Sequence, residues 1–186
     1  QVAGSSEHPA ELTLVRRLRA PSPARLALTG ALVNAAFDIL VRQPHASDEE
    51  ILEEAFRTRP LARAAEAYMG ELSAVDADTR NLLPTLRATL ASFGTAHLIL
   101  EPSYVSPIVG LQGRADIIAV DADRYRIIEL KAGRAATGTT IRVDHAAQAA
   151  GYAALVRLAE GRSELIPEVW YVRDTTTPFR PVRAWQ

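Results

Sequence analysis

The sequence predicts an α/β (α+β) fold, in which a mixed central sheet is flanked by helices and preceded by a helical N-terminal part. Helical periodicity and helix-start signals fill residues 10–95. Short runs of β-branched and aromatic residues, bounded by turn residues, dominate residues 96–186. We therefore expect a single domain over residues 10–186, with a mainly helical part and then a β-rich core, after a loose terminus at residues 1–9.

Five helices are expected in the first part. Apolar residues recur there every three, four or seven positions, as on one face of a helix. Ser47 and Glu50 have the spacing of a capping box, and Pro23 and Pro60 suit the first turn of a helix. The expected helices span residues 11–19, 23–42, 47–56, 60–73 and 76–93.

The second part is expected to run in the order β–β–β–α–β–β. Its single helix is rich in alanine, and its strands are separated by Gly, Asp and Thr residues. The second and third strands are joined by the turn residues 121–124, which predicts a hairpin. The expected strands span residues 97–105, 114–120, 125–131, 168–173 and 179–185, with the helix at 144–160.

Composition limits the function classes. The 186 residues are 48% hydrophobic and 23% charged, which is ordinary for a folded protein. A formal net charge of −1 argues against nonspecific coating of nucleic acid but leaves room for a local basic groove. No apolar run is long enough to cross a membrane. The chain has no cysteine, which excludes an iron–sulfur cluster, and Lys131 is its only lysine among 21 basic residues.

The expected hairpin carries two opposed carboxylates. If Val120 faces Tyr125, the same register places Asp116 directly opposite Glu129, with Cβ atoms about 5 Å apart. Such a pair on otherwise apolar strands repels unless a cation lies between the acids or one of them is protonated. Hard divalent cations such as Mg²⁺ or Mn²⁺ take these oxygen ligands. The alternative is an exposed hairpin with two solvated acids, although the apolar residues around Glu129 favour burial.

Two further spacings add to this pattern. Lys131 is two residues from Glu129, so both side chains point to the same face of the strand. Gln148 and Tyr152 are four residues apart and share one face of the expected helix. Gly113, just before the hairpin, permits close approach of a backbone or ligand.

Taken together, these motifs resemble the PD-(D/E)xK nuclease superfamily, in its RecB-like branch. They are most similar to the nuclease domain of the DNA replication ATP-dependent helicase/nuclease family, over residues 98–175. The matching positions are Glu101, Ser106, Gly110-Leu111, Gly113 and Asp116, then Glu129-Leu130-Lys131-Ala132-Gly133, then His145, Gln148 and Tyr152.

The resemblance implies a restriction-endonuclease-like core and metal-dependent hydrolysis of DNA. Asp116, Glu129 and the backbone carbonyl of Leu130 would hold Mg²⁺ or Mn²⁺, with Glu101 as an accessory acid. Lys131 would position the attacking water. The catalytic set would be completed by Gln148 and Tyr152, which would line the site and grip DNA.

Four more residues are candidates around this site. Arg114, Arg134 and Arg142 flank the acids and are expected to contact the DNA backbone, as is His145. A solvated-surface role is the alternative for each arginine, and a simple role at the helix start is the alternative for His145. The resemblance places a histidine ligand on an N-terminal helix where this sequence has Asn34, whose amide oxygen is a weaker metal ligand.

We therefore expect a Mg²⁺/Mn²⁺-dependent deoxyribonuclease acting on single-stranded ends or flaps in DNA repair or replication. The first and last residues suggest a domain of a longer helicase–nuclease, and a free-standing nuclease of the same fold is the variant of this hypothesis. A catalytically inactive module that binds DNA or scaffolds a complex is the alternative from another class, favoured by Asn34. The bias toward arginine and alanine predicts a bacterial protein of the cytoplasm or nucleoid.

Overall fold

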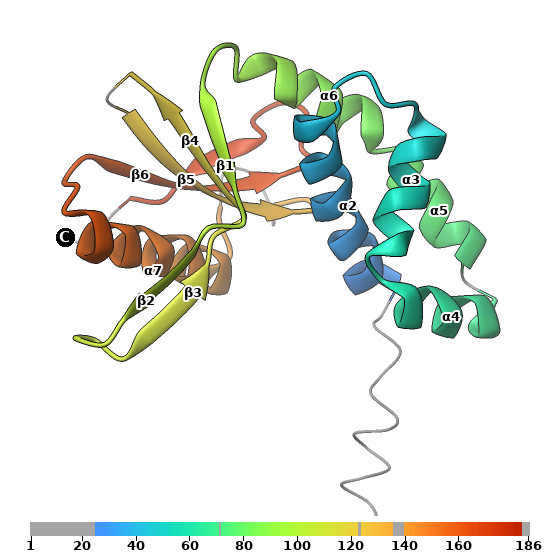
Figure 1. The fold of residues 1–186 in the computed structure, drawn as a ribbon, viewed down its shortest axis with the longest axis horizontal. Coiled ribbons are helices and arrows are strands. Elements are labelled where there is room, and N and C mark those ends of the chain that lie inside the picture. Colours follow the sequence, from blue (N-terminus) through green and yellow to red (C-terminus); the bar gives the residue numbers. More distant parts are fainter. Residues whose placement is uncertain (1–24, 71, 123, 136–139, 184–186) are drawn as a thin grey trace, which may run out of the picture.

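The computed structural model describes residues 25–70, 72–122, 124–135 and 140–183. The expected loose terminus and the expected helix at 11–19 lie outside these residues. Within them, the chain forms a mixed five-stranded sheet flanked by helices, which confirms the predicted fold class (Figure 1).

The helical part consists of five helices in the described residues. Ser47 accepts a hydrogen bond from the backbone amide of Glu50, whose side chain accepts one in return, so the predicted capping box is present. The helices are α2 (Arg25–Arg42), α3 (Asp48–Arg57), α4 (Pro60–Met69), α5 (Leu72–Arg80) and α6 (Leu83–Ser92).

The remaining elements form the sheet, the hairpin that extends from it and one helix. The strands are β1 (His97–Leu100), β2 (Ser103–Ser106), β3 (Leu111–Arg114), β4 (Ile117–Asp121), β5 (Arg124–Lys131), β6 (Leu165–Tyr171) and β7 (Phe179–Pro181), and the helix is α7 (Val143–Glu160). The sheet order is β1-β4-β5-β6-β7. Among the strands of the described residues, only β5 and β6 pair in parallel, and α7 is the crossover that parallel neighbours require.

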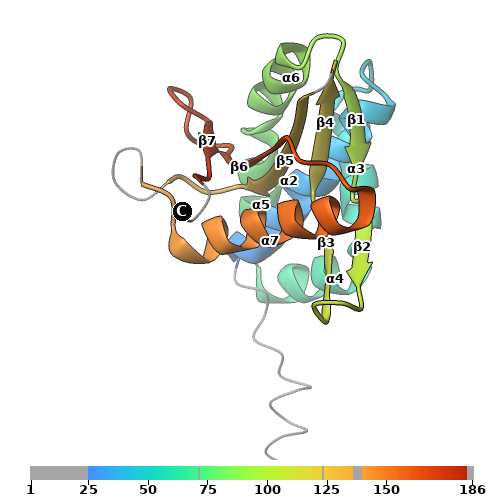
Figure 2. The same ribbon diagram turned by 90° about the vertical axis from the view of Figure 1, so that its left-hand side faces the viewer.

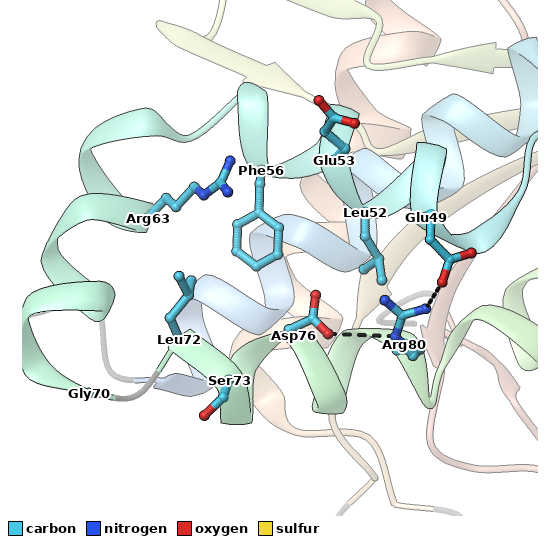
Figure 3. A pocket seen from close by; sticks show the side chains of 10 residues that line it. All are labelled: Glu49, Leu52, Glu53, Phe56, Arg63, Gly70, Leu72, Ser73, Asp76 and Arg80. Atoms are coloured by element: carbon cyan, nitrogen blue, oxygen red, sulfur yellow. Dashed lines mark hydrogen bonds and ion pairs between the residues drawn. The ribbon is translucent and has the colours of Figure 1, made fainter.

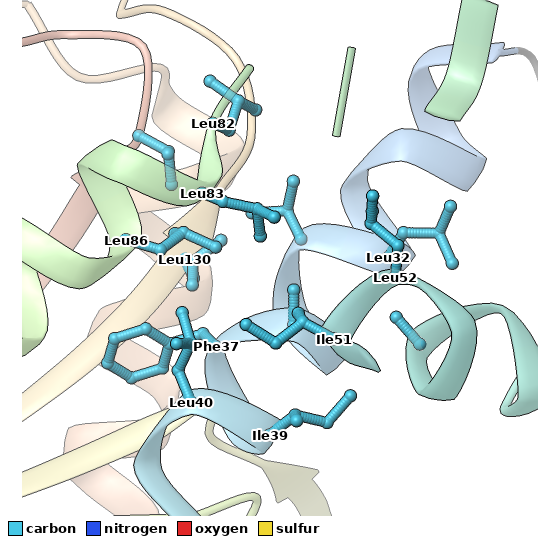
Figure 4. Close-up of a cluster of buried hydrophobic side chains, with 14 of the residues drawn as sticks. Leu32, Phe37, Ile39, Leu40, Ile51, Leu52, Leu82, Leu83, Leu86 and Leu130 are labelled. Atoms are coloured by element: carbon cyan, nitrogen blue, oxygen red, sulfur yellow. The ribbon is translucent and has the colours of Figure 1, made fainter. Parts of the chain in front are cut away.

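Helices cover both faces of the sheet. On one face, α2, α3, α5 and α6 enclose the largest apolar core, shown in Figure 4, and Phe37 packs edge-on against Trp170 with ring centroids 5.0 Å apart. On the other face, α7 packs on the sheet through small residues such as Ala149 and Ala153. The alanine-rich composition of α7 therefore lets the helix approach the sheet closely, and with it the side chains that it carries.

Two predicted strands are wrong in their boundaries. The run 97–105 is divided at Glu101, whose backbone adopts φ +48°, and the run 114–120 is divided before Ile117. Arg114 therefore belongs to β3, which pairs with β2 in a separate two-stranded sheet. Pairing nevertheless continues in one register through the bend, because the amide of Glu101 donates to the carbonyl of Asp116 at 2.9 Å. The result is one long bent hairpin (Figure 2).

Helix boundaries differ as well. The expected helix at 76–93 is two helices, because Pro84 lies in the first turn of α6 and lacks the amide hydrogen that a continuous helix needs. The expected helix at 60–73 ends at Met69, followed by Gly70 with φ +77°. The β6 and β7 strands begin or end up to four residues from the expected positions.

Candidate active site

The bend in the long hairpin is where the acidic side chains meet. The β4–β5 register matches the expected one, with Val120 opposite Tyr125, and its extension places Asp116 opposite Glu129. Asp116 accepts a hydrogen bond of 2.7 Å from the backbone amide of Leu130. Glu129 is only 3% exposed, so the burial expected from its apolar neighbours is observed.

Lys131 joins the acids to α7. Its Nζ lies 2.5 Å from Oε1 of Glu129 and 3.1 Å from Oε1 of Gln148. Gln148 in turn donates from Nε2 to the hydroxyl of Tyr152 at 2.9 Å. The side chains predicted from two separate motifs therefore form one continuous chain of hydrogen bonds from β5 to the helix.

Gly113 explains how the helix reaches this position. A Cβ atom placed on Gly113 would lie 2.7 Å from Cε1 of Tyr152 and 3.1 Å from Cδ1 of Leu155. Real side chains do not tolerate the shorter of these distances, so the Tyr152 ring occupies the space that glycine leaves open. The close approach expected at Gly113 is thus made by an aromatic side chain of α7.

Asn34 contacts the acidic pair from α2, in the helical part of the fold. Its Nδ2 is 3.3 Å from Oδ1 of Asp116, while its own Oδ1 is buried and has no hydrogen-bond partner among the described residues. Oε2 of Glu129 is likewise buried and unpaired there. Buried oxygens of this kind, which have no hydrogen-bond donor, can coordinate a divalent cation. The donor set therefore fits Mg²⁺ or Mn²⁺.

This site holds fewer acids than a metal cage of protein side chains would. In the ranges that the structure covers, no three His, Cys, Asp or Glu side chains form a metal-binding group. Asp116 and Glu129 supply two carboxylates, which leaves the other positions to carbonyl or amide oxygens and to water. Mg²⁺ in particular is held in this way, by one or two carboxylates while it keeps several waters.

The electrostatics agree with a site built for a cation. Burial raises the pKa of Glu129 to about 7, and the charge of Asp116 adds to the rise, while Lys131 opposes it. Burial also raises the pKa of Asp116, against the hydrogen bond from Leu130 and the charge of Lys131. Without a cation, the pair therefore retains protons at a pH where exposed carboxylates are ionised.

Asp38 belongs to this region but was not predicted from the sequence. It follows Asn34 by one turn of α2, and it lines a pocket of about 470 Å³ together with Glu101 and Asp116. Burial raises its pKa to about 6, and the charges of Glu101 and Asp116 contribute. The spacing of four residues between Asn34 and Asp38 was the available signal. Across the bend, Glu101 forms a 3.0 Å ion pair with Arg114.

A second pocket, of about 380 Å³, lies on the Lys131 side and shares Asn34 with the first. Arg134, Arg142 and His145, three of the six predicted DNA contacts, line it, whereas Arg114 lines the acidic pocket. Its basic and imidazole side chains are Lys131, Arg134, Arg142 and His145. Nδ1 of His145 is 2.8 Å from the hydroxyl of the buried Tyr171, and burial together with the Lys131 charge lowers the pKa of the imidazole. Tyr171, whose hydroxyl holds His145 in place, was not predicted from the sequence.

A larger cavity, of about 660 Å³, lies between α3, α4 and α5 (Figure 3). It contains none of the predicted site residues. Arg80 pairs there with Glu49 of α3 at 2.6 Å and with Asp76 of its own helix at 3.6 Å, so the charge of this arginine is already matched within the protein. Its size alone gives no reason to place the chemistry there.

Comparison with known proteins identifies the class. The family model of the PD-(D/E)XK nuclease superfamily matches residues 10–182, and the chain belongs to this superfamily. Members of the superfamily are nucleases that use divalent metals, and their substrates are nucleic acids. Searches of curated proteins and of solved structures found no match. None of the helices in the described ranges is both long and apolar enough to span a membrane.

Proposed function

We propose that this chain is a Mg²⁺- or Mn²⁺-dependent deoxyribonuclease that hydrolyses single-stranded ends or flaps. The observation that carries the proposal is the buried, opposed pair Asp116 and Glu129 with Lys131 beside it. The motif order supports the RecB-like branch and a role in DNA repair or replication, as a domain of a helicase–nuclease or together with a helicase. A bacterial cytoplasm or nucleoid is the setting that we propose for it.

The metal ligands that we propose are Asp116, Glu129 and the backbone carbonyl of Leu130, with Asn34 and Glu101 as additional oxygen donors. The cation would polarise the phosphodiester and lower the pKa of the attacking water. The unpaired oxygens of Asn34 and Glu129 support this ligand set, because burial of such atoms is costly without a partner.

The protein's own residues then orient the reactants. Lys131 is held between Glu129 and Gln148, where its ammonium group is fixed to position a water and to balance charge on the phosphate. Gln148 and Tyr152 form the wall on the helix side. Arg114, Arg134 and Arg142, with His145, bind neighbouring phosphates.

The second candidate function is a nuclease-fold module that binds DNA without cutting it. Asn34 favours it, because an amide replaces the imidazole that related nucleases place on this helix. The intact set of Asp116, Glu129 and Lys131 favours the enzyme, because a site without chemistry has no physical need for buried, opposed acids.

End-labelled single-stranded and flap DNA incubated with Mg²⁺, Mn²⁺ or EDTA distinguishes these functions. Lys131→Ala and Glu129→Ala are the test variants, and Glu53→Ala, at an exposed carboxylate of α3, is the matched control. We expect metal-dependent cutting by the parent chain and the control, and its loss in both test variants. Folded protein that binds DNA but cuts it with neither metal would establish the binding module instead.

A further inference from the structure

The β2–β3 hairpin presents an aliphatic tip to solvent. Ile108 is 83% exposed and Val105 is 69% exposed, while Val109 and Leu111 are each 49% exposed. All four belong to the end of one hairpin, with Ile108 and Val109 in its turn and Val105 and Leu111 on opposite faces of the strands beside it. Figures 1 and 2 show the hairpin extending away from the five-stranded sheet, past α7.

This hairpin is fixed to the candidate active site at two points. Gly113 of β3 packs against Tyr152, which belongs to the hydrogen-bond chain of Lys131. Tyr104 of β2 donates a 2.6 Å hydrogen bond to Glu160 at the far end of α7. The tip therefore has a fixed position relative to the acids, and β3 leads through the bend directly to Asp116.

The hairpin carries no negative charge of its own that would repel a polyanion. Residues 102–115 contain no acidic side chain, and their single charge is Arg114 at the base. Arg114 and Gln112 are two residues apart on β3, so they share a strand face that leads from the site toward the tip. A nucleic-acid strand leaving the site along this face passes Arg114, which is paired with Glu101, then a polar side chain and finally aliphatic side chains.

We propose that the β2–β3 hairpin is a wedge whose aliphatic tip, Ile108 and Val109, inserts at the last base pair where single-stranded DNA joins a duplex and unstacks that pair. Aliphatic side chains serve proteins elsewhere as wedges between base steps. The inference rests on the proposed nuclease function and specifies its substrate as a junction. Eight residues separate Ile108 from Asp116, a span of at most about 26 Å at strand spacing. The cut therefore falls within about eight nucleotides of the junction, at about 3.4 Å per nucleotide.

A fluorescent adenine analogue, 2-aminopurine, at the terminal base pair of a forked duplex reports unstacking directly. The measurement is made in EDTA, so its readout does not depend on hydrolysis. The test variant is Ile108→Ser with Val109→Ser, and the matched control is Leu61→Ser, at an aliphatic residue of α4 that is 85% exposed. We expect fluorescence to rise on binding of the parent chain and of the control, and this rise to be lost in the tip variant.

Cleavage of the same fork and of plain single-stranded DNA, with Mn²⁺, completes the test. The tip variant should lose about tenfold in fork cleavage, the size expected for the loss of one apolar contact, and cut single strands at the parent rate. Its products should also lose their fixed distance from the junction. The wedge is overturned if the tip variant raises the fluorescence as much as the parent chain does and keeps the parent's ratio of fork to single-strand cleavage. The tip would then be assigned to a protein partner. If the parent chain cuts neither DNA, the nuclease function fails, while the fluorescence in EDTA still decides the wedge.

Discussion

Replacing Glu129 by Gln should stabilise the metal-free protein while removing its response to metal. The substitution keeps the shape of a side chain that is 3% exposed and removes the charge that burial disfavours. The Lys131 ammonium retains its contact with Gln148. The Glu129→Gln variant therefore isolates the cost of one buried negative charge.

The size of the effect follows from the raised pKa of Glu129. Below the unfolded value of 4.5 the group is protonated in both states, so it contributes no pH dependence. Between 4.5 and about 7 the folded state binds more protons than the unfolded state, so the free energy of unfolding falls as pH rises. The full pKa shift corresponds to a loss of about 3 kcal/mol in the free energy of unfolding, and this loss is complete above the folded-state pKa. We expect the Glu129→Gln variant to recover 1 to 3 kcal/mol, in order of magnitude, at about pH 8.

Urea unfolding from about pH 5 to 8, in EDTA and in Mn²⁺, measures both parts of this prediction. The parent chain should lose stability with rising pH in EDTA and regain it with Mn²⁺, because cation binding offsets the charge. The variant should show a flatter pH profile and little stabilisation by Mn²⁺. A variant less stable than the parent chain at the upper end of this range would refute the reasoning, since it would show that ionised Glu129 is net stabilising.

Three further substitutions test other parts of the structure. Gly113→Ala should displace Tyr152, cost about 1–3 kcal/mol of stability and reduce cleavage. Thermal unfolding measures the stability, and an end-labelled assay measures the cleavage. Unaltered stability and cleavage would contradict the close contact between Gly113 and Tyr152. Ser47→Ala should cost about 1 kcal/mol by removing the cap of α3, with cleavage unchanged once the protein is folded, and denaturant titration measures this. Asn34→His should tighten Mn²⁺ binding in calorimetry, and an unchanged affinity would show that the position is not a ligand.

The sequence predicted the fold where local chemistry decides it. The β4–β5 register followed from the turn residues 121–124 that join the two strands, because a short connection limits which residues can pair. The break between α5 and α6 was missed although Pro84 marks it, because a continuous apolar period outweighed one proline in the prediction. The bend at Glu101 was missed because a non-glycine residue at φ +48° follows from the surrounding structure rather than from propensity.

In the candidate site, too, the sequence predicted what residues close in the chain determine and missed what the tertiary fold determines. Strand and helix periodicity placed Glu129 with Lys131 and Gln148 with Tyr152, because each pair is local in the chain. The resemblance supplied the link between the two pairs, which the structure makes through a hydrogen bond from Lys131 to Gln148. Asp38 was missed because its neighbours Glu101 and Asp116 lie on a distant hairpin, and only the tertiary fold brings them to α2.

The continuous register through the bent hairpin also makes its length adjustable. Since β1–β4 and β2–β3 share one pairing frame, two residues added to each of β2 and β3 would extend the arm by about 7 Å. Every side chain would keep its face, because the alternation along a strand repeats every two residues. Asp116 and Glu129 would not move. Insertion or deletion of residue pairs can therefore change the length of the hairpin, and with it the distance from the tip to the acids. The positions of the acids themselves need not change.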